Sequence, residues 1–193
     1  MMNTKMMMNN YKNHKYMNKI KKTATTFILA IYSIISYSQK DSIYIKKTID
    51  NMEDKVYCQA SRLMICMNTE SKVIGFYLFP IIDFEKEKAS VSGLAVVMKN
   101  IGSCVENNEI IILFEDDSKI KLKSWNDFNC DGNAWFNTNS EDLSKLSSLK
   151  IKKIKVQNGR TYDSYTHEIK QDSDYFIQVF YAINNNKFKV VKK

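Results

Sequence analysis

The sequence predicts a mainly β protein with a minor helical part (α+β), built as an antiparallel β-sheet or sandwich with one or two short helices. Three observations carry this prediction. Short apolar runs of strand length recur from residue 73 onward, one segment alternates strictly between apolar and charged residues, and an Asn-Gly pair separates two further segments. Residues 39–183 are expected to form a single β-rich domain, since one proline and five scattered glycines leave no linker.

Residues 1–38 are predicted to be a signal peptide. Six lysines and no acidic residue come first, an apolar run follows from Thr23 to Tyr37, and Ser36 and Ser38 supply small residues at its end. This run is shorter than the roughly 20 residues that cross a bilayer. An uncleaved anchor is the alternative reading, and Met17 is an alternative start. We therefore expect export to the periplasm or the cell exterior, with no membrane span after cleavage.

Most of the net positive charge of the chain comes from the predicted leader. The whole chain has 29 basic and 21 acidic residues and a formal charge of +8, but six of the basic residues and none of the acidic ones lie in the leader. The remainder has 23 bases against 21 acids, a net of +2. A strongly basic chain would suggest nucleic acid as a partner. After cleavage that argument is lost, and no nucleic-acid partner is expected.

The strands are predicted from apolar runs and alternation. Ile120 and Leu122 face one way while the lysines around them face the other, and Asn158-Gly159 is a strong hairpin signal between two strands. The expected strands are 73–79, 93–98, 109–114, 119–123, 151–156 and a return strand within 160–169.

Two helices are predicted. The first begins with the capping residues of 139–142 and places Leu143 and Leu146 on one side. The second covers 174–183, where Phe176, Val179, Phe180 and Ile183 form one stripe. Because this segment is rich in aromatic and β-branched residues, a final strand is the alternative. Residues 184–193, rich in Lys and Asn, are expected to be a flexible basic tail.

The four cysteines allow three pairings. Residues that pair across a hairpin have position numbers with a near-constant sum. A turn at Asp116-Asp117 gives a sum of 233 and a turn at Asp117-Ser118 gives 235. The position numbers of Cys104 and Cys130 add up to 234, between these two values. We therefore predict a Cys104–Cys130 disulfide. A second pair, Cys58 with Cys66, is left open against the alternative that both are reduced strand residues.

Four aromatic residues surround Cys130. Trp125, Phe128, Trp135 and Phe136 form a ligand platform if they are exposed together, and a satellite core under a long loop if they are buried together. Burial is the favoured reading. Trp125 and Trp135 are nevertheless the first candidates for a binding surface, in a loop that runs from Trp125 to Phe136.

A second candidate surface follows the Asn-Gly pair. Arg160, Tyr162 and Tyr165 lie there, beside a segment of lysines between 150 and 155, and this combination suggests contact with a polyanion or a saccharide. The favoured alternative is that the lysines protect an edge strand from aggregation.

Catalytic and metal sites are weakly indicated. Asp127, Asn129, Asp131 and Gly132 match the opening of a calcium loop, but Thr138 occupies the position of the closing glutamate. His167, the one histidine outside the leader, has acidic residues near it in sequence without the convergence that catalysis needs. We therefore expect no catalytic residue, no metal and no cofactor.

Three segments carry a resemblance to a known group of proteins. They are 101–107, 122–136 and 158–165, which hold Cys104, Trp125, Cys130 and Tyr162. These segments resemble uncharacterised secreted proteins of Bacteroidetes-type bacteria, over most of residues 43–183. The resemblance supports export and implies no known activity.

Together these features predict an exported, non-enzymatic β-rich module of unknown role that binds an envelope protein or glycan. Two other classes stay open. One is a small extracellular hydrolase that uses His167 for proton transfer, and the other is a calcium-stabilised domain of the adhesion type.

Overall fold

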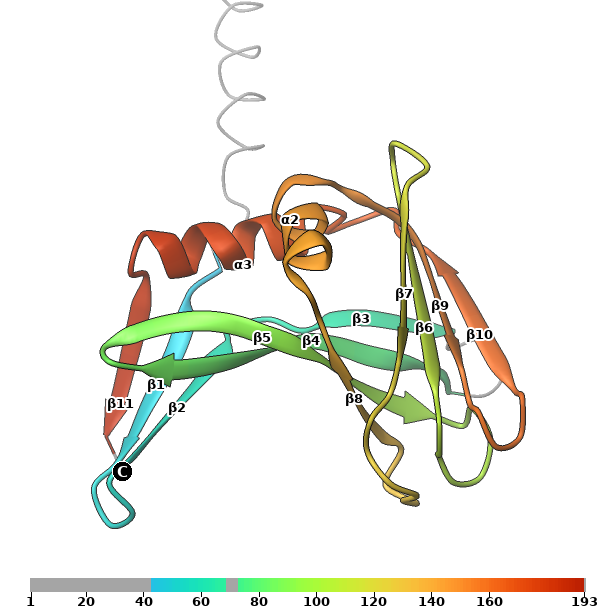
Figure 1. The fold of residues 1–193 in the computed structure, drawn as a ribbon, viewed down its shortest axis with the longest axis horizontal. Helices are drawn as coiled ribbons and strands as arrows, with labels where there is room; N and C mark the ends of the chain where they lie inside the picture. Colours follow the sequence, from blue (N-terminus) through green and yellow to red (C-terminus); the bar gives the residue numbers. More distant parts are fainter. Residues whose placement is uncertain (1–42, 69–72, 193) are drawn as a thin grey trace, which may run out of the picture. The chain divides into compact units, whose positions relative to one another are not determined.

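The computed structural model describes residues 43–68 and 73–192. The predicted signal peptide lies outside these residues. They form two β-sheets and two helices around one hydrophobic core (Figure 1). The mainly β prediction with two short helices is therefore confirmed.

The larger sheet has seven strands in the order β11-β1-β2-β4-β5-β8, with β3 paired to β4 as well. All of its pairings are antiparallel except that of β1 with β11, which is parallel. The strands are β1 Ile45–Asp50, β2 Lys55–Ala60, β3 Met64–Asn68, β4 Ile74–Glu85, β5 Lys88–Lys99, β8 Asn133–Asn137 and β11 Phe188–Lys192.

The smaller sheet has four antiparallel strands in the order β10-β9-β6-β7. The predicted alternation sets its faces, since Ile110, Ile112, Ile120 and Ile154 are buried while Lys119 and Lys121 are exposed. Its strands are β6 Glu109–Phe114, β7 Lys119–Lys123, β9 Ile151–Gln157 and β10 Ser164–Glu168. Because β9 lies between β6 and β10, the reading of its lysines as edge protection is wrong.

Helix α2 spans Ser140–Ser148 and helix α3 spans Tyr175–Asn184. The side chain of Asn139 caps α2 by accepting from the backbone nitrogen of Asp142 (2.9 Å), as the sequence predicts. Phe176, Val179 and Ile183 bury one side of α3, which packs against α2, β1 and β5 (Figure 1). The alternative of a final strand over this segment is therefore wrong.

The tail after α3 is not flexible throughout. Phe188–Lys192 form β11, which pairs with β1 from Ile45↔Phe188 to Ile49↔Lys192. The expectation of a flexible basic tail over 184–193 is wrong for this strand, because β1 offers a free edge that the short segment completes. Composition alone does not reveal such a partner.

Strand β4 continues past Pro80 and is therefore longer than the predicted strand 73–79. Pro80 lies within the strand, opposite Leu94 of β5, although proline cannot donate a ladder hydrogen bond. On its other edge β4 pairs with β3 as far as Leu78 and with β2 at Ile82, so Pro80 lies where the partner changes. Among the described residues no helix is long and apolar enough to cross a membrane.

Candidate functional site

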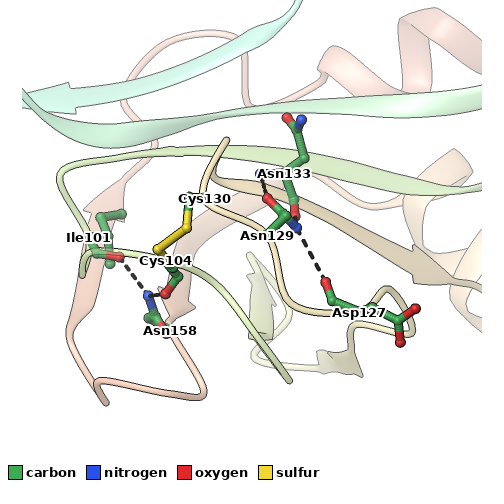
Figure 2. The surroundings of a disulfide bond; sticks show 7 residues. All are labelled: Ile101, Cys104, Asp127, Asn129, Cys130, Asn133 and Asn158. Atoms are coloured by element: carbon green, nitrogen blue, oxygen red, sulfur yellow. Dashed lines mark hydrogen bonds between the residues drawn. A yellow bond between two sulfur atoms is a disulfide. The ribbon is translucent and has the colours of Figure 1, made fainter.

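The predicted Cys104–Cys130 disulfide is present, with the two Cα atoms 4.2 Å apart (Figure 2). Beside it, Val105 and Asn129 form an isolated antiparallel bridge. The β6–β7 hairpin pairs Glu109 with Lys123, so continuing its register would place Asp127 opposite Val105. Asn129 lies there instead, because the second segment has two more residues between the hairpin and the bridge. The disulfide pairing was therefore predicted correctly, whereas the strand register on which the prediction was based is not the observed one.

Cys58 and Cys66 are free thiols, so the second disulfide left open by the sequence is not formed. They lie on β2 and β3, which both pair with β4, Cys58 opposite Ile82 and Cys66 opposite Phe76. Cys66 is fully buried, and burial raises the pKa of its thiol to about 12. Both behave as strand residues, which was the alternative reading.

Asn158 connects the disulfide segment to the turn after β9 (Figure 2). It is fully buried. Its Nδ2 donates to the carbonyl oxygens of Ile101 (3.0 Å) and Cys104 (2.8 Å), and its Oδ1 accepts from the backbone nitrogen of Arg160 (2.9 Å). One amide side chain therefore fixes both segments.

The turn between β9 and β10 comprises residues 158–163. The backbone nitrogen of Asn158 donates to the carbonyl oxygen of Asp163 (2.8 Å), and that of Tyr162 donates to the carbonyl oxygen of Asn158 (2.9 Å). The Asn-Gly pair thus makes the predicted hairpin, but with a longer turn than the two-residue type that it favours. The extra residues place Arg160 and Tyr162 at the tip.

Gly159 holds this turn close to the segment before β6. A Cβ atom on Gly159 would lie 2.1 Å from the carbonyl oxygen of Asn107 and 2.4 Å from that of Glu106, so no larger residue fits. The backbone nitrogen of Gly159 donates to Oδ1 of the buried Asn108 (3.2 Å). Nδ2 of Asn108 is buried without a hydrogen-bond partner among the described residues.

We define the aromatic surface as Trp125, Phe128, Trp135 and Arg160. The ring centroids of Trp125 and Trp135 are 6.0 Å apart at an interplanar angle of 32°. Cζ of Arg160 lies 4.9 Å from the centroid of the Phe128 ring. Trp125 is 59% exposed and Phe128 49%, whereas Phe136 is fully buried. The favoured burial of the four aromatic residues is therefore wrong for Trp125 and Phe128 and correct for Phe136.

Hydrogen bonds within the loop hold the two tryptophans together. The backbone nitrogen of Trp125 donates to the carbonyl oxygen of Trp135 (3.0 Å), and the backbone nitrogen of Trp135 donates to Oδ1 of Asn126 (2.9 Å). Nδ2 of Asn126 in turn donates to the carbonyl oxygen of Asn133 (3.1 Å). The spacing of the tryptophans is therefore set by main-chain geometry.

In the segment that resembles a calcium loop, residues 127–132, the side chain of Asn129 forms its hydrogen bonds within the loop. Asn129 donates from Nδ2 to the carbonyl oxygens of Asp127 (3.4 Å) and Asn133 (2.9 Å), and its Oδ1 accepts from the backbone nitrogen of Asn133 (3.2 Å) (Figure 2). Its amide therefore closes the turn instead of pointing with Asp127 toward a common ion.

A groove lies at the end of the smaller sheet where β6, β7 and β9 meet the 158–163 turn, and we call it the end groove. Its volume is about 440 Å³. Glu109, Lys123 and Gln157 form one cross-strand row of its floor, since Glu109 pairs with both of the others. Tyr162 is 75% exposed and forms one wall. The groove is lined by Asn107, Glu109, Lys123, Gln157, Gly159 and Tyr162.

Tyr165 is not part of either region. It lies on β10 opposite the buried Val156, and its ring packs edge-on against Phe76 with centroids 6.2 Å apart. Of the five predicted binding residues, the structure brings Trp125 and Trp135 together, while Arg160 lies over the Phe128 ring of the same loop and Tyr162 lines the end groove. Sequence reasoning missed Lys123 and Gln157, whose outward direction follows from the alternation of β7 and β9.

A second groove, of about 500 Å³, lies beside His167 between β3 and β10. The hydrolase hypothesis required such a cleft. Nδ1 of His167 is 3.4 Å from the hydroxyl of Tyr165, while Glu168 pairs with Lys153 and Asp172 with Arg62. Burial and the nearby Lys170 lower the pKa of His167, whereas pairing with a carboxylate would raise it. Among the described residues, both carboxylates that line this groove are thus paired with a cation.

No protein-family model, curated protein or solved structure matches this chain.

Proposed function

We propose that this chain is an exported, non-enzymatic module that binds an envelope glycan through the aromatic surface. Export is supported by the leader pattern of residues 1–38 and by the Cys104–Cys130 disulfide, because such bonds persist in oxidising compartments.

The pairing of Trp125 with Trp135 is the observation that carries this proposal. The centroids of the two indole rings are 6.0 Å apart and their planes are inclined by 32°, and Trp125 keeps more than half of its surface exposed. Large exposed aromatic residues held in a group mark binding sites in soluble domains. The apolar C–H faces of pyranose rings complement an exposed indole ring such as that of Trp125.

A glycan fits these surroundings better than a protein does. A stable protein interface buries about 800 Å² on each partner around an apolar centre. Here the tryptophans are flanked at once by polar groups, with Asn126 and Asn133 in the loop and Arg160 across from it. A small aromatic surface with a guanidinium group and polar loop groups beside it suits a ligand rich in hydroxyl groups.

The test is calorimetric titration of the processed protein with three neutral hexasaccharides: maltohexaose, cellohexaose and hexa-N-acetylchitohexaose. We expect binding of at least one of them, weakened about tenfold or more by Trp125→Ala, because the sugar loses its stacking face. Tyr57→Ala is the matched control, since Tyr57 is 50% exposed on β2, in the larger sheet. It should bind as the unaltered protein does.

The proposal fails if none of the three oligosaccharides binds, or if Trp125→Ala and Tyr57→Ala weaken binding equally. A purified envelope protein that binds the same surface, with the oligosaccharides inactive, would instead identify a protein partner.

A further inference from the structure

We propose that the end groove is a saccharide subsite, in which Tyr162 stacks on a pyranose ring and Asn107, Lys123 and Gln157 hydrogen-bond to its hydroxyl groups. This inference deepens the proposed glycan binding and rests on it. It adds a second contact region, on the outward side of the four-stranded sheet, for the same ligand.

The groove has polar side chains that the protein itself does not use. Within the described part of the chain, the side chains of Asn107, Lys123, Gln157 and Tyr162 make no hydrogen bond or ion pair. Glu109 differs, because its carboxylate pairs with Lys121 at 2.6 Å. Amide, ammonium and phenol groups that converge on one concavity, beside an aromatic face, are the set that a sugar ring requires.

The conformation of Tyr162 is the second observation. Its φ is 62°, in the left-handed region that a bulky residue rarely adopts and that costs of order 1 kcal/mol or more. Its ring is nevertheless exposed and gains little burial in return. The turn therefore presents an aromatic side chain to solvent at a backbone conformation that a smaller residue would adopt at lower cost.

The groove is also held rigid before any ligand arrives. Gly159 lies against the carbonyl oxygens of Glu106 and Asn107. The side chain of Asn158 fixes the start of the turn through its hydrogen bonds. The floor residues Lys123, Glu109 and Gln157 come from three paired strands. Binding therefore has only a small entropic cost for ordering these side chains and the turn.

Two chain segments connect the end groove to the aromatic surface. Lys123 is two residues before Trp125, and Tyr162 is two residues after Arg160. Two residues of extended chain span about 7 Å, which is of the order of one sugar residue. A single oligosaccharide can therefore contact both regions.

The test is calorimetric titration of Tyr162→Asn and Lys123→Ala with whichever hexasaccharide the unaltered protein binds. Asparagine tolerates a positive φ, so Tyr162→Asn should fold with an equal or higher melting temperature. We expect Tyr162→Asn to weaken binding about tenfold and Lys123→Ala about threefold. Lys119→Ala, at the other end of β7 and also exposed, is the matched control and should change nothing.

Three outcomes are distinguishable. Loss of affinity in Tyr162→Asn with a native melting curve supports the subsite. Binding that is sensitive to Trp125→Ala but unchanged in Tyr162→Asn overturns the subsite and keeps the proposed function. Failure of the unaltered protein to bind any of the three hexasaccharides overturns both.

Discussion

The side-chain amide of Asn158 donates a 2.8 Å hydrogen bond to the main-chain carbonyl oxygen of Cys104. This bond joins a turn of the four-stranded sheet to the half-cystine that anchors the Trp125–Phe136 loop. The Asn158 amide and the Cys104–Cys130 disulfide (Figure 2) thus link the turn that carries Arg160 and Tyr162 to the loop that carries Trp125. The first two predictions concern this linkage.

Removal of the disulfide should destabilise the domain without abolishing its sheets. For the double variant Cys104→Ala/Cys130→Ala, whose cysteines are separated by 26 positions, the loop-entropy model gives a loss of about 3–4 kcal/mol in the free energy of unfolding. Urea unfolding followed by far-UV circular dichroism measures it. Cys58→Ala, which alters a half-buried free thiol, should cost less than about 1.5 kcal/mol. Equal losses of unfolding free energy in the two variants would contradict a stabilising role of the disulfide.

Asn158→Ala should lower the free energy of unfolding by about 2–4 kcal/mol. The variant leaves the carbonyl oxygens of Ile101 and Cys104 without their donor in a buried site, and it removes the acceptor of the Arg160 backbone nitrogen. Chemical denaturation measures the loss. Asn137→Ala, at an exposed position of β8, is the control and should stay within about 0.5 kcal/mol of the unaltered protein. A similarly small loss in Asn158→Ala would show that the amide does not hold the two segments together.

The buried thiol of Cys66 should make the protein less stable in alkali. Its pKa is raised from 9.0 to about 12 in the folded state, so the unfolded chain releases this proton first as the pH rises. The stabilising contribution is complete below pH 9 and is lost between pH 9 and about 12, at about 1.4 kcal/mol per pH unit. Thermal melts of the unaltered protein and of Cys66→Ala over this range measure the difference.

The two melting temperatures should converge as the pH rises, because alanine at this position cannot titrate. Burial also raises the pKa of Tyr175, which destabilises both proteins in the same direction. A constant difference between pH 8 and pH 11 would contradict the assignment to Cys66.

Deletion of residues 188–193 should lower the melting temperature by about 5 °C or more, because it removes β11 and leaves β1 as an unpaired edge. A flexible tail would instead be removed without effect. Val190→Lys is the control, since Val190 is 54% exposed and the strand keeps its backbone pairing. We expect that variant to melt within about 2 °C of the unaltered protein. Differential scanning calorimetry makes the comparison.

Local patterns in the sequence determined much of the fold. The alternation of 119–123 matches β7, the isoleucine-rich run 109–114 matches β6, and the capping residues before Leu143 begin α2 as predicted. These elements were predictable because their burial pattern repeats with the period of the element itself. The disulfide partners were predicted from the same regularity, although two extra residues in the second segment shift the register between the hairpin and the disulfide.

Tertiary structure decided what depends on distant partners. Phe188–Lys192 became a strand because β1 offered an edge, and β4 continued past Pro80 because its partner changes there. In the same way Trp125 lies exposed while Phe136 is buried, although both belong to one aromatic-rich loop. A local sequence pattern does not contain the position of a partner strand. The assembly of the sheets, the disulfide and the Asn158 turn therefore decides which aromatic rings face solvent.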